Sequence, residues 1–493
     1  MSVQATPGFD LQPSAQQQVL STNYITNFDF LNQYLPDTYE KEFERYGNRT
    51  IASFLRMVGA EMPTNSDMIK WAEQGRLHTK YTNVSSNIAA GANNTAIITI
   101  ADAFDPTLNT GVTSAALRVG QTVMISDNTP GSTNTNKGVI LTAPYGTSTA
   151  AGGGGGAAML ENQIEVAYYE TTQSFAAATS CTLFIYGSEF AKGTNGMQGS
   201  LEADDFFFQN KPIILKDKYS VSGSDMAQIG WVEIQTENGA NGYLWYLKSE
   251  HETRLRFEDY METAMIEAVP AANTSQAQIA LVSGTPQAND DQAGSEGIFY
   301  VVNNRGNVWG GGNPTTLAGF DSVIQRLDKQ GAIEENVIFV NRNFSFDIDD
   351  MLAAQNSYGA GGTSYGLFDN DKDMALNLGF TGFRRGYDFY KSDWKYLNDP
   401  TMRGGLVAGA VNGLLVPAGS TSVYDQILGK NAKRPFLHVR YRASETEDRR
   451  YKTWITGSAG GARTSDLDAM EVNFLSERAV CTLGANNFFL FQS

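Results

Sequence analysis

The chain has 493 residues, of which 41% are hydrophobic and 11% aromatic, so it can bury more than one core. Its 36 Lys and Arg side chains against 53 Asp and Glu give a formal charge of −17, which argues against strong nonspecific binding to nucleic acid. Its two cysteines, Cys181 and Cys481, exclude a disulfide framework and a thiolate zinc site, and they fit synthesis in a reducing cytoplasm.

Residues 1–35 are predicted to form a polar N-terminal arm. The arm lacks a basic segment followed by an apolar one, so nothing marks it for secretion. Residues 1–22 carry too few large apolar side chains to become ordered alone, and we expect a neighbouring molecule to hold them. No window approaches 18 uncharged apolar residues, so we expect no membrane span.

Residues 36–76 are predicted to form two or three short helices. The last of them covers 66–75, with Ser66 as its N-cap and Gly75 just after its last turn. Gly59 closes the helix before it.

Residues 77–225 are predicted to be a β-rich excursion that contains an inserted β-domain at about 85–195. Short strands such as TAIITIA, QTVMISD and CTLFIYG, separated by Asn, Gly, Thr and Pro, indicate a small barrel or sandwich. The glycine run at 150–158 lacks the lysine and the helix start of a phosphate-binding loop. We interpret it as a mobile hairpin tip.

The segment 226–290 is predicted to contain the longest helix, over 241–269, which Pro270 ends. A helix of this length in a mixed chain is expected to lie across a sheet, and we expect that sheet to include the C-terminal strands. The side chains assigned to its apolar stripe are Leu244, Leu247, His251, Leu255, Met261, Met265 and Ala268.

Residues 291–432 are predicted to contain a β-α-β unit. Its parts are a strand at IFYVVNNRGN, a helix at LAGFDSVIQRLDKQG closed by Gly331, and a strand at ENVIFVNR that pairs in parallel with the first. Residues 433–493 are predicted to be strands, at RPFLHVRYR, YKTWITG, VNFLSERAVCTLG and NNFFLF.

No pattern in the sequence predicts catalysis, and we expect no catalytic, cofactor-binding or metal-binding residue. His78, His251 and His438 lie in three different predicted elements, and no serine has the flanking glycines of a nucleophile elbow.

Two acidic clusters have the residue types of a calcium site. The second begins like an EF-hand loop, but Met374 stands where the turn glycine belongs and Phe380 where the bidentate glutamate belongs. We interpret both clusters as solvated loops. They consist of Asp347, Asp349 and Asp350, and of Asp369, Asp371 and Asp373.

The basic residues near the C-terminus alternate with acids, which favours a salt-bridged hairpin in contact with a neighbouring subunit over a nucleic-acid surface. An isolated basic pair, Arg384 and Arg385, lies further upstream. The C-terminal group consists of Arg440, Arg442, Arg449, Arg450 and Lys452, beside Glu445, Glu447 and Asp448.

The order of these elements resembles the Hong Kong 97 type fold of tailed-phage major capsid proteins, an α+β fold with an N-arm, an E-loop, a P-domain with a long spine helix, and an A-domain. Four segments look most like the crAss-like phage members. They are NKPIILKDKYSVSGSDMAQIGWVE, FYKSDWKYLNDPTMRGG, GLLVPAGSTSVYDQ and VNFLSERAVCTLGANNFFLF.

The resemblance implies an E-loop at 77–225, a P-domain at 226–290 and 433–493, and an A-domain at 291–432. It implies a structural major capsid protein, not an enzyme, that assembles into pentamers and hexamers of an icosahedral head shell. The shell would enclose double-stranded DNA without sequence-specific binding. Portal, scaffold and auxiliary head proteins are the implied partners, the host bacterial cytoplasm the site of synthesis, and the virion the final location.

Two features depart from the family pattern. The family's E-loop is commonly a plain hairpin, whereas residues 80–200 are long enough to contain an inserted β-domain. Many members begin with a long helical scaffolding segment, and here only about 22 residues precede the first ordered-looking element, so we expect a separate scaffold and no large N-terminal cleavage. The alternatives are a fibre or tail component and, from another class, a carbohydrate-active enzyme whose β-insert binds glycan.

Overall fold

The chain forms two units in a computed structural model: residues 71–208 make one, and residues 1–70 with 209–493 make the other. The predicted arm at 1–35 and the helices predicted before residue 61 lie outside the described residues. The structure describes residues 61–492 except 76–79, 89–94, 106–109, 113–116, 143–159, 161, 172–176, 199–204, 228–233, 236–240, 243–244, 272–293, 332, 356–381, 426–429, 460 and 462.

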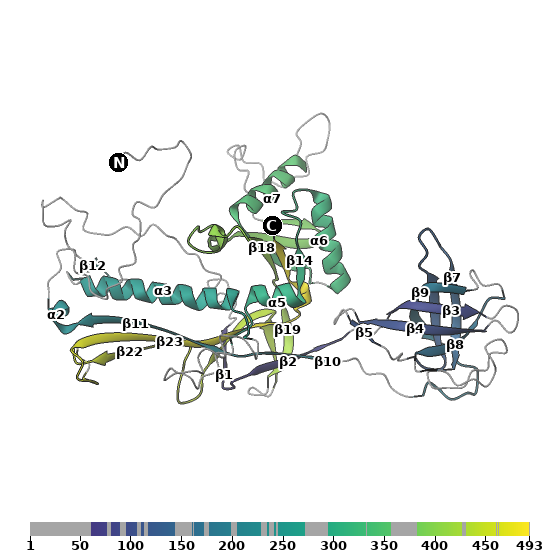
Figure 1. Cartoon of the computed structure of the whole chain (residues 1–493), viewed down its shortest axis with the longest axis horizontal. Helices are drawn as coiled ribbons and strands as arrows, with labels where there is room; N and C mark the ends of the chain where they lie inside the picture. Colours follow the sequence, from purple (N-terminus) through teal and green to yellow (C-terminus); the bar gives the residue numbers. More distant parts are fainter. Residues whose placement is uncertain are drawn as a thin grey trace. The chain divides into compact units, whose positions relative to one another are not determined.

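Within the described part of 71–208, six strands close into an antiparallel barrel (Figure 1). The order around the barrel is β3-β9-β6-β7-β8-β4, and β4 pairs again with β3 to close it, while the short β5 extends from β4. The strands are β3 (Lys80–Ile88), β4 (Thr95–Asp105), β5 (Thr110–Val112), β6 (Gln121–Asp127), β7 (Thr135–Thr142), β8 (Gln163–Tyr168) and β9 (Ala177–Ser188).

Alternating side chains fill the barrel, as the period of a strand requires. On β6, Val123 and Ile125 are fully buried while Met124 between them is not. Gly138 on β7 sits so close to β8 that a Cβ there would lie 2.4 Å from the carbonyl oxygen of Ala167. The barrel interior is formed by Tyr81, Val84, Ala96, Ile98, Ile100, Leu117, Val123, Ile125, Ile140, Ile164, Val166, Tyr168, Cys181 and Leu183.

The strand segments predicted in this region all lie in barrel strands, because their β-branched runs and their turn residues agree with each other. The inserted domain was predicted at about 85–195, and the unit that contains the barrel is longer at both ends, from 71 to 208. The glycine run at 150–158 lies outside the described residues.

The helix predicted over 66–75 is wrong, because this segment contains the strand β2 (Ile69–Gln74). Its exposure alternates with every residue, and β2 pairs with β10 (Asp205–Asn210). Trp71 on β2 packs against Phe208 on β10, with 6.2 Å between ring centroids. Ser66, predicted as an N-cap, instead donates its hydroxyl to the Met68 carbonyl at 2.9 Å. A partner strand far along the chain overrides the local helical spacing.

The larger unit contains a five-stranded sheet built around one long strand, β23. One edge of β23 pairs with β11, and its other edge pairs first with β22 and then with β21, on which β1 lies in parallel. The strands are β1 (Glu61–Thr64), β11 (Ile213–Ser222), β21 (Leu437–Arg442), β22 (Lys452–Gly457) and β23 (Ala469–Thr482).

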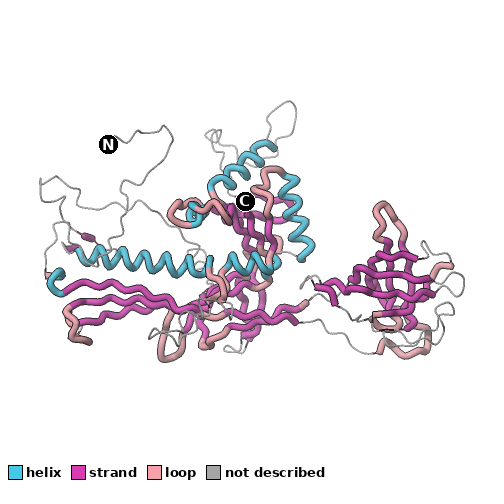
Figure 2. The backbone as a smooth tube through the Cα atoms, viewed as in Figure 1, coloured by secondary structure: helices cyan, strands magenta, loops and turns pink. Residues whose placement is uncertain are grey.

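The helix α3 (Trp245–Glu267) lies along β11 and β23 (Figures 1 and 2), as predicted for the long helix. Thr253, Phe257, Met261 and Met265 are buried at intervals of four residues, which keeps them on one helix face. The Phe257 ring lies 5.8 Å from that of Phe474 on β23 and 5.7 Å from that of Tyr451.

The predicted limits and apolar face of this helix need correction. Residues 241–242 belong to the strand β13 (Asn241–Gly242), which pairs with β12 (Ile234–Gln235), so the helix begins later. Leu255, assigned to the buried stripe, is 36% exposed. Leu255 and Met261 are six positions apart, which at 100° per residue places them roughly 120° apart around the helix. The predicted stripe therefore mixed two faces, and Phe257 marks the one that meets the sheet.

A second sheet, of six strands among the described residues, has the order β14-β24-β18-β15-β17-β16. The last strand of the chain, β24, pairs within this sheet and not with β23. The strands are β14 (Asn307–Trp309), β15 (Glu335–Val340), β16 (Gly382–Arg385), β17 (Tyr387–Asp393), β18 (Val411–Pro417) and β24 (Phe489–Gln492).

Helices cover both faces of this sheet. Helices α6 (Leu317–Gln330) and α7 (Arg342–Gln355) pack on the face that carries Ile338 and Val340. Helix α5 (Ile298–Arg305) packs on the face that carries Phe339. Met265 at the end of α3 joins that second core, so the two sheets of this unit share apolar contacts.

The predicted β-α-β unit is correct in its helix and its second strand but wrong in its first strand and its pairing. The helix α6 is capped by Thr316, and Gly331 ends it in the left-handed region with φ 77°. The run IFYVVNNR forms α5, where Ile298, Phe299, Val301 and Val302 are buried at helical spacing. Strands β14 and β15 are separated by β24 and β18, so they do not pair.

The acidic segment FDIDD, predicted as a loop, lies in helix α7. The predicted C-terminal strands are confirmed as β21, β22, β23 and β24. The remaining described elements are α2 (Gly223–Met226), the hairpin of β19 (Ser420–Asp425) and β20 (Lys430–Pro435), and the 3-10 turns η2 (Lys395–Leu397), η3 (Arg403–Gly405) and η4 (Ala485–Asn487).

The packing of α3 on the sheet predicts unequal effects of two substitutions on one helix. Phe257→Ala should lower the free energy of unfolding by about 3 to 5 kcal/mol, because it leaves a cavity beside Phe474. Leu255→Ala is the matched control and should have a much smaller effect, since Leu255 is partly exposed. Denaturant titration of the two purified variants measures both, and equal losses would contradict this packing.

Candidate assembly surface

In the part of the chain that the structure describes, α3 covers one face of the five-stranded sheet and leaves the second face open. On β11, Leu215 and Tyr219 pack on the helix side, whereas Ile214, Lys216 and Lys218 point away and are exposed. This open face continues across the sheet, because Asn473 on β23 is the register partner of both Lys218 and Trp454 on β22.

The outer edge of β11 is also open among the described strands. There β11 pairs only with β23, so no described strand pairs with the other edge of its ten residues. An edge of this length is a template for pairing with another chain, and lysines limit indiscriminate pairing. Lys216 and Lys218 occupy such positions on the exposed side of β11.

A cluster of ion pairs links β1 to the other strands of the five-stranded sheet. Glu61 on β1 forms ion pairs with Arg450 and, at 3.6 Å, with Arg478. Glu477 lies 2.7 Å from Nε of Arg449 and 3.7 Å from Nη1 of Arg442. The side chains of Glu61, Glu477 and Arg478 are largely buried, so each charge depends on its partners within the cluster.

The predicted basic hairpin is therefore salt-bridged within its own chain. Arg442 also pairs with Asp67, and Lys452 pairs with Glu447 at 2.7 Å. The two central carboxylates, Glu61 and Glu477, were not predicted as site residues from the sequence. The signal for one of them is the charged pair Glu477-Arg478 inside an otherwise apolar strand. Upstream, Arg384 pairs with Asp388 at 3.2 Å and Arg385 with Asp321.

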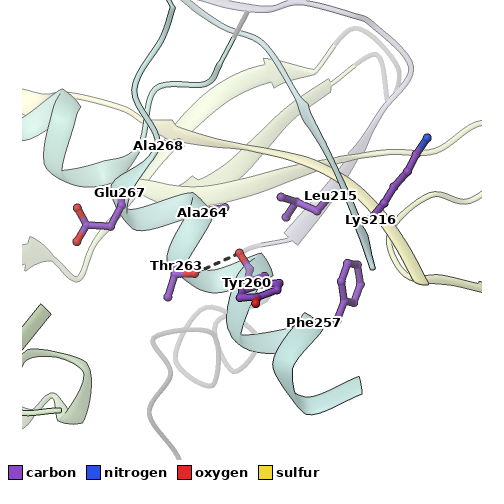
Figure 3. Close-up of a pocket in the computed structure, with 8 residues that line it drawn as sticks. All are labelled: Leu215, Lys216, Phe257, Tyr260, Thr263, Ala264, Glu267 and Ala268. Carbon is purple, nitrogen blue, oxygen red and sulfur yellow. Dashed lines mark hydrogen bonds between the residues drawn. The ribbon is translucent and has the colours of Figure 1, made fainter. Parts of the chain in front are cut away.

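An apolar groove of about 440 Å³ runs between α3 and β11 (Figure 3). Leu215 and Phe257 form its inner wall, Tyr260 stands at its side, and Glu267 lies at the far end of its helical wall. Its lining residues are Leu215, Lys216, Phe257, Tyr260, Thr263, Ala264, Glu267 and Ala268.

The described histidines do not form a catalytic arrangement with a nucleophile. His251 lies on α3, where its Nδ1 is 3.2 Å from Arg254. His438 lies on β21, buried opposite Cys481 in the strand register, and its Nδ1 is 3.1 Å from the Pro435 carbonyl oxygen. His78 lies outside the described residues.

Burial keeps the neighbouring pair on β21 and β23 uncharged. It lowers the pKa of His438 to about 4 and raises the pKa of the Cys481 thiol to about 12. A neutral imidazole beside a neutral thiol lacks the thiolate that acts as a nucleophile. Cys181 is buried within the barrel, and burial raises the pKa of its thiol to about 11.

The first acidic cluster is engaged in contacts within the fold. Lys391 pairs with Asp349 at 2.5 Å, and Asn313 donates to Asp347 at 2.6 Å. The second cluster, at 369–373, lies outside the described residues. In the part of the chain that the structure describes, no three His, Cys, Asp or Glu side chains gather as a metal site would require. No described helix is both long and apolar enough to span a bilayer.

Comparison with known proteins gives structural matches only. No protein-family model and no curated protein matches the sequence. A chain from Microbacterium phage Oxtober96 matches with a TM-score of 0.36 and 9% identity, covering 94% of this chain and 97% of that one. The bacteriophage PhiM1 mature capsid matches with a TM-score of 0.32 and 10% identity, covering 62% of this chain and 78% of that one. The holo-SrpI encapsulin complex from Synechococcus elongatus PCC 7942 also matches with a TM-score of 0.32 and 10% identity, covering 59% of this chain and 77% of that one.

The charge cluster predicts that Glu61→Gln is destabilising. The substitution leaves Arg478 buried with one partner fewer, and we expect a loss of about 3 kcal/mol or more in the free energy of unfolding. Glu447→Gln is the control, because Glu447 forms a solvent-exposed pair with Lys452 and its loss should change stability little. Chemical denaturation compares the two, and a Glu61→Gln variant as stable as the control would contradict the cluster's role.

The pKa of His438 predicts an acid-sensitive stability. The folded pKa, about 4, is below the ordinary value of 6.5, so the unfolded chain binds the proton first and stability falls as the pH drops through this window. His438 should account for about 2 kcal/mol of stability lost between pH 7 and pH 5. His438→Gln should remove that component. Unfolding curves at both pH values test this, and an unchanged pH dependence in the variant would contradict it.

Proposed function

We propose that this chain is a structural shell subunit, the major capsid protein of a tailed bacteriophage with the Hong Kong 97 type fold, and a crAss-like member of that group. The role proposed is assembly, not catalysis. The subunits form the pentamers and hexamers of an icosahedral head shell, and the mature protein is located in the virion.

The observation that carries the proposal is the long two-layer body of the larger unit. A 23-residue helix lies along antiparallel strands of ten and fourteen residues that come from distant parts of the chain. Among the described elements, one face and one edge of this sheet stay open, and Ile214 and Trp454 are exposed on that face. Such surfaces suit a protein whose neighbours cover them.

The family's domain names apply as follows under this proposal. The helix α3 is the spine helix of a P-domain, and the five-stranded sheet is the rest of that domain. The six-stranded sheet with α6 and α7 belongs to the A-domain. The E-loop is the excursion predicted at 77–225, with the closed barrel as its inserted domain, except that its last strand, β11, lies in the five-stranded sheet and so belongs to the P-domain. A domain in this position gives each subunit an added surface beyond the shell-forming parts.

The proposed partners are other copies of this chain, with portal, scaffold and auxiliary head proteins. The enclosed double-stranded DNA makes no sequence-specific contact with the shell. The formal charge of −17 supports this, because an acidic wall repels the phosphate backbone. The pairing of the C-terminal arginines with Glu61 and Glu477 supports it too, since those cations are already neutralised within the fold.

The proposal predicts self-assembly of the full-length chain. Expressed with the scaffold and portal of the same phage, it should yield closed particles of uniform diameter in negative-stain electron microscopy and a fast-sedimenting species in ultracentrifugation. Expression without the portal is the control and should still give closed shells, because the shell contacts lie between copies of this chain. Fibres, or subunits that never associate under either condition, would overturn the proposal.

A further inference from the structure

We propose that the outer face of the barrel binds a neutral oligosaccharide. The site is formed by three aromatic rings and two charged side chains, all of them within the unit at 71–208. They are Lys137, Tyr169, Phe184, Tyr186 and Glu189. This site adds a binding function that does not depend on the proposed assembly of the shell.

The strand register gathers these side chains on one surface. Leu183 on β9 fills the barrel, so Phe184, the next residue, points outward. Phe184 is the register partner of Met124 on β6, which is in turn the partner of Lys137 on β7. The backbone N–H of Tyr169, directly after β8, donates to the carbonyl oxygen of Lys137 at 3.1 Å. Three steps between neighbouring strands therefore separate Tyr169 from Phe184, roughly 14 Å along the surface.

The aromatic rings on this surface are open to solvent. Tyr169 is 48% exposed, Tyr186 is 49% exposed and Phe184 is 37% exposed. Large apolar groups that are exposed together mark a surface that binds another molecule. Tyr169 follows β8 whereas the other two lie on β9, and these two strands do not pair with each other. The fold of the barrel, and not one apolar strand, therefore brings the rings together.

Polar contacts hold the two tyrosine rings in place. Tyr169 donates its hydroxyl to Glu189, and Nζ of Lys137 lies 6.0 Å from the ring centroid of Tyr186. Glu189 is fixed in turn, because its backbone N–H donates to the carbonyl oxygen of Gly120 at 2.9 Å. Partial burial and the Glu189 carboxylate raise the pKa of Tyr169, and the neighbouring Tyr186 hydroxyl adds to this rise. Rings that are fixed before binding lose little freedom when a ligand arrives.

The combination of open rings with a carboxylate and an ammonium group fits a sugar. A pyranose carries C–H groups on its face, which pack on the electron-rich face of an aromatic ring, and its hydroxyls stand around the rim. Glu189 can accept sugar hydroxyls through the carboxylate oxygen that Tyr169 does not use, and Lys137 can donate to sugar oxygens. A surface that crosses four strands accommodates a chain of sugars rather than a single one.

Charge argues against the other ligands that pack on aromatic rings. Residues 71–208 contain five Lys and Arg against eleven Asp and Glu, and Glu189 lies among the rings, so single-stranded nucleic acid and anionic glycans are repelled. The centre of a protein interface is depleted of charge, because a covered charge without a partner loses its hydration. A hydrated sugar leaves Lys137 and Glu189 in contact with water, which favours a glycan over a protein.

Calorimetric titration of the full-length chain with linear hexasaccharides tests the site. The probes are the hexamers of glucose, of mannose and of N-acetylglucosamine, with a heparin hexasaccharide as the anionic comparison. At least one neutral hexamer should bind, and heparin should not. Tyr186→Ala should weaken this binding about tenfold, because one ring is lost from the surface. Tyr186→Phe keeps the ring and should bind nearly as well as the unaltered chain. Glu189→Gln keeps every ring and should still weaken binding, since the charged acceptor is lost.

Tyr390→Ala is the matched control, because Tyr390 is 54% exposed but lies on β17 of the other unit, so this variant should bind like the unaltered chain. Thermal unfolding checks that each variant is folded. The site is wrong if no neutral hexamer binds, if heparin binds more tightly, or if folded Tyr186→Ala and Glu189→Gln bind as well as the unaltered chain. Fewer particles from Tyr186→Ala, with sugar binding unchanged, would show that this face contacts a protein and would also overturn the site. Failure of the site leaves the shell function standing, since particle formation by the unaltered chain is measured separately.

Discussion

The pairing of β23 on both of its edges is the interaction on which the larger unit depends. Its fourteen residues hold β11 on one side and β22 and β21 on the other, and one face of the strand packs on α3 through Met470, Val472 and Phe474. The chain then passes through η4 into β24, which lies within the six-stranded sheet. One segment near the C-terminus therefore organises the first sheet and joins it to the second.

This arrangement ties together parts of the chain that are far apart in sequence. Ile213 pairs with Arg478, and Glu61 on β1 meets Arg450 and Arg478. Pairing over such separations must overcome the entropy of closing long loops, which slows folding. The charge cluster is well placed to select the correct register late in that process, because a one-residue slip of β23 would move Glu477 and Arg478 to the wrong faces of the sheet.

Prediction from the sequence succeeded where local signals agreed with the final packing. Helix α6 combines a threonine cap, an apolar stripe through Phe320 and Leu327, and a left-handed glycine, and all of these act within one segment. The barrel strands likewise carry β-branched runs between turn residues. The strand predicted at Ile298–Arg305 was wrong because short apolar segments fit a helix or a strand equally well. The sheet face on which the segment packs decides between the two. The helix predicted over 66–75 was wrong for a related reason, since β10, the strand that pairs with residues 69–74, comes more than a hundred residues later. The groove was not predictable, because α3 and β11 are brought together only by the tertiary fold.

The ends of the inserted barrel meet. Strands β2 and β10 pair where the chain leaves and re-enters the larger unit, and the rings of Trp71 and Phe208 pack against each other at this point. To the rest of the chain, the insertion is equivalent to a hairpin of two short strands, whatever lies between them. A different domain with adjacent termini could replace the barrel without altering the register of the long sheet. The chain thus has a built-in position at which one inserted domain can be exchanged for another, during evolution or by engineering, while the larger unit keeps its fold.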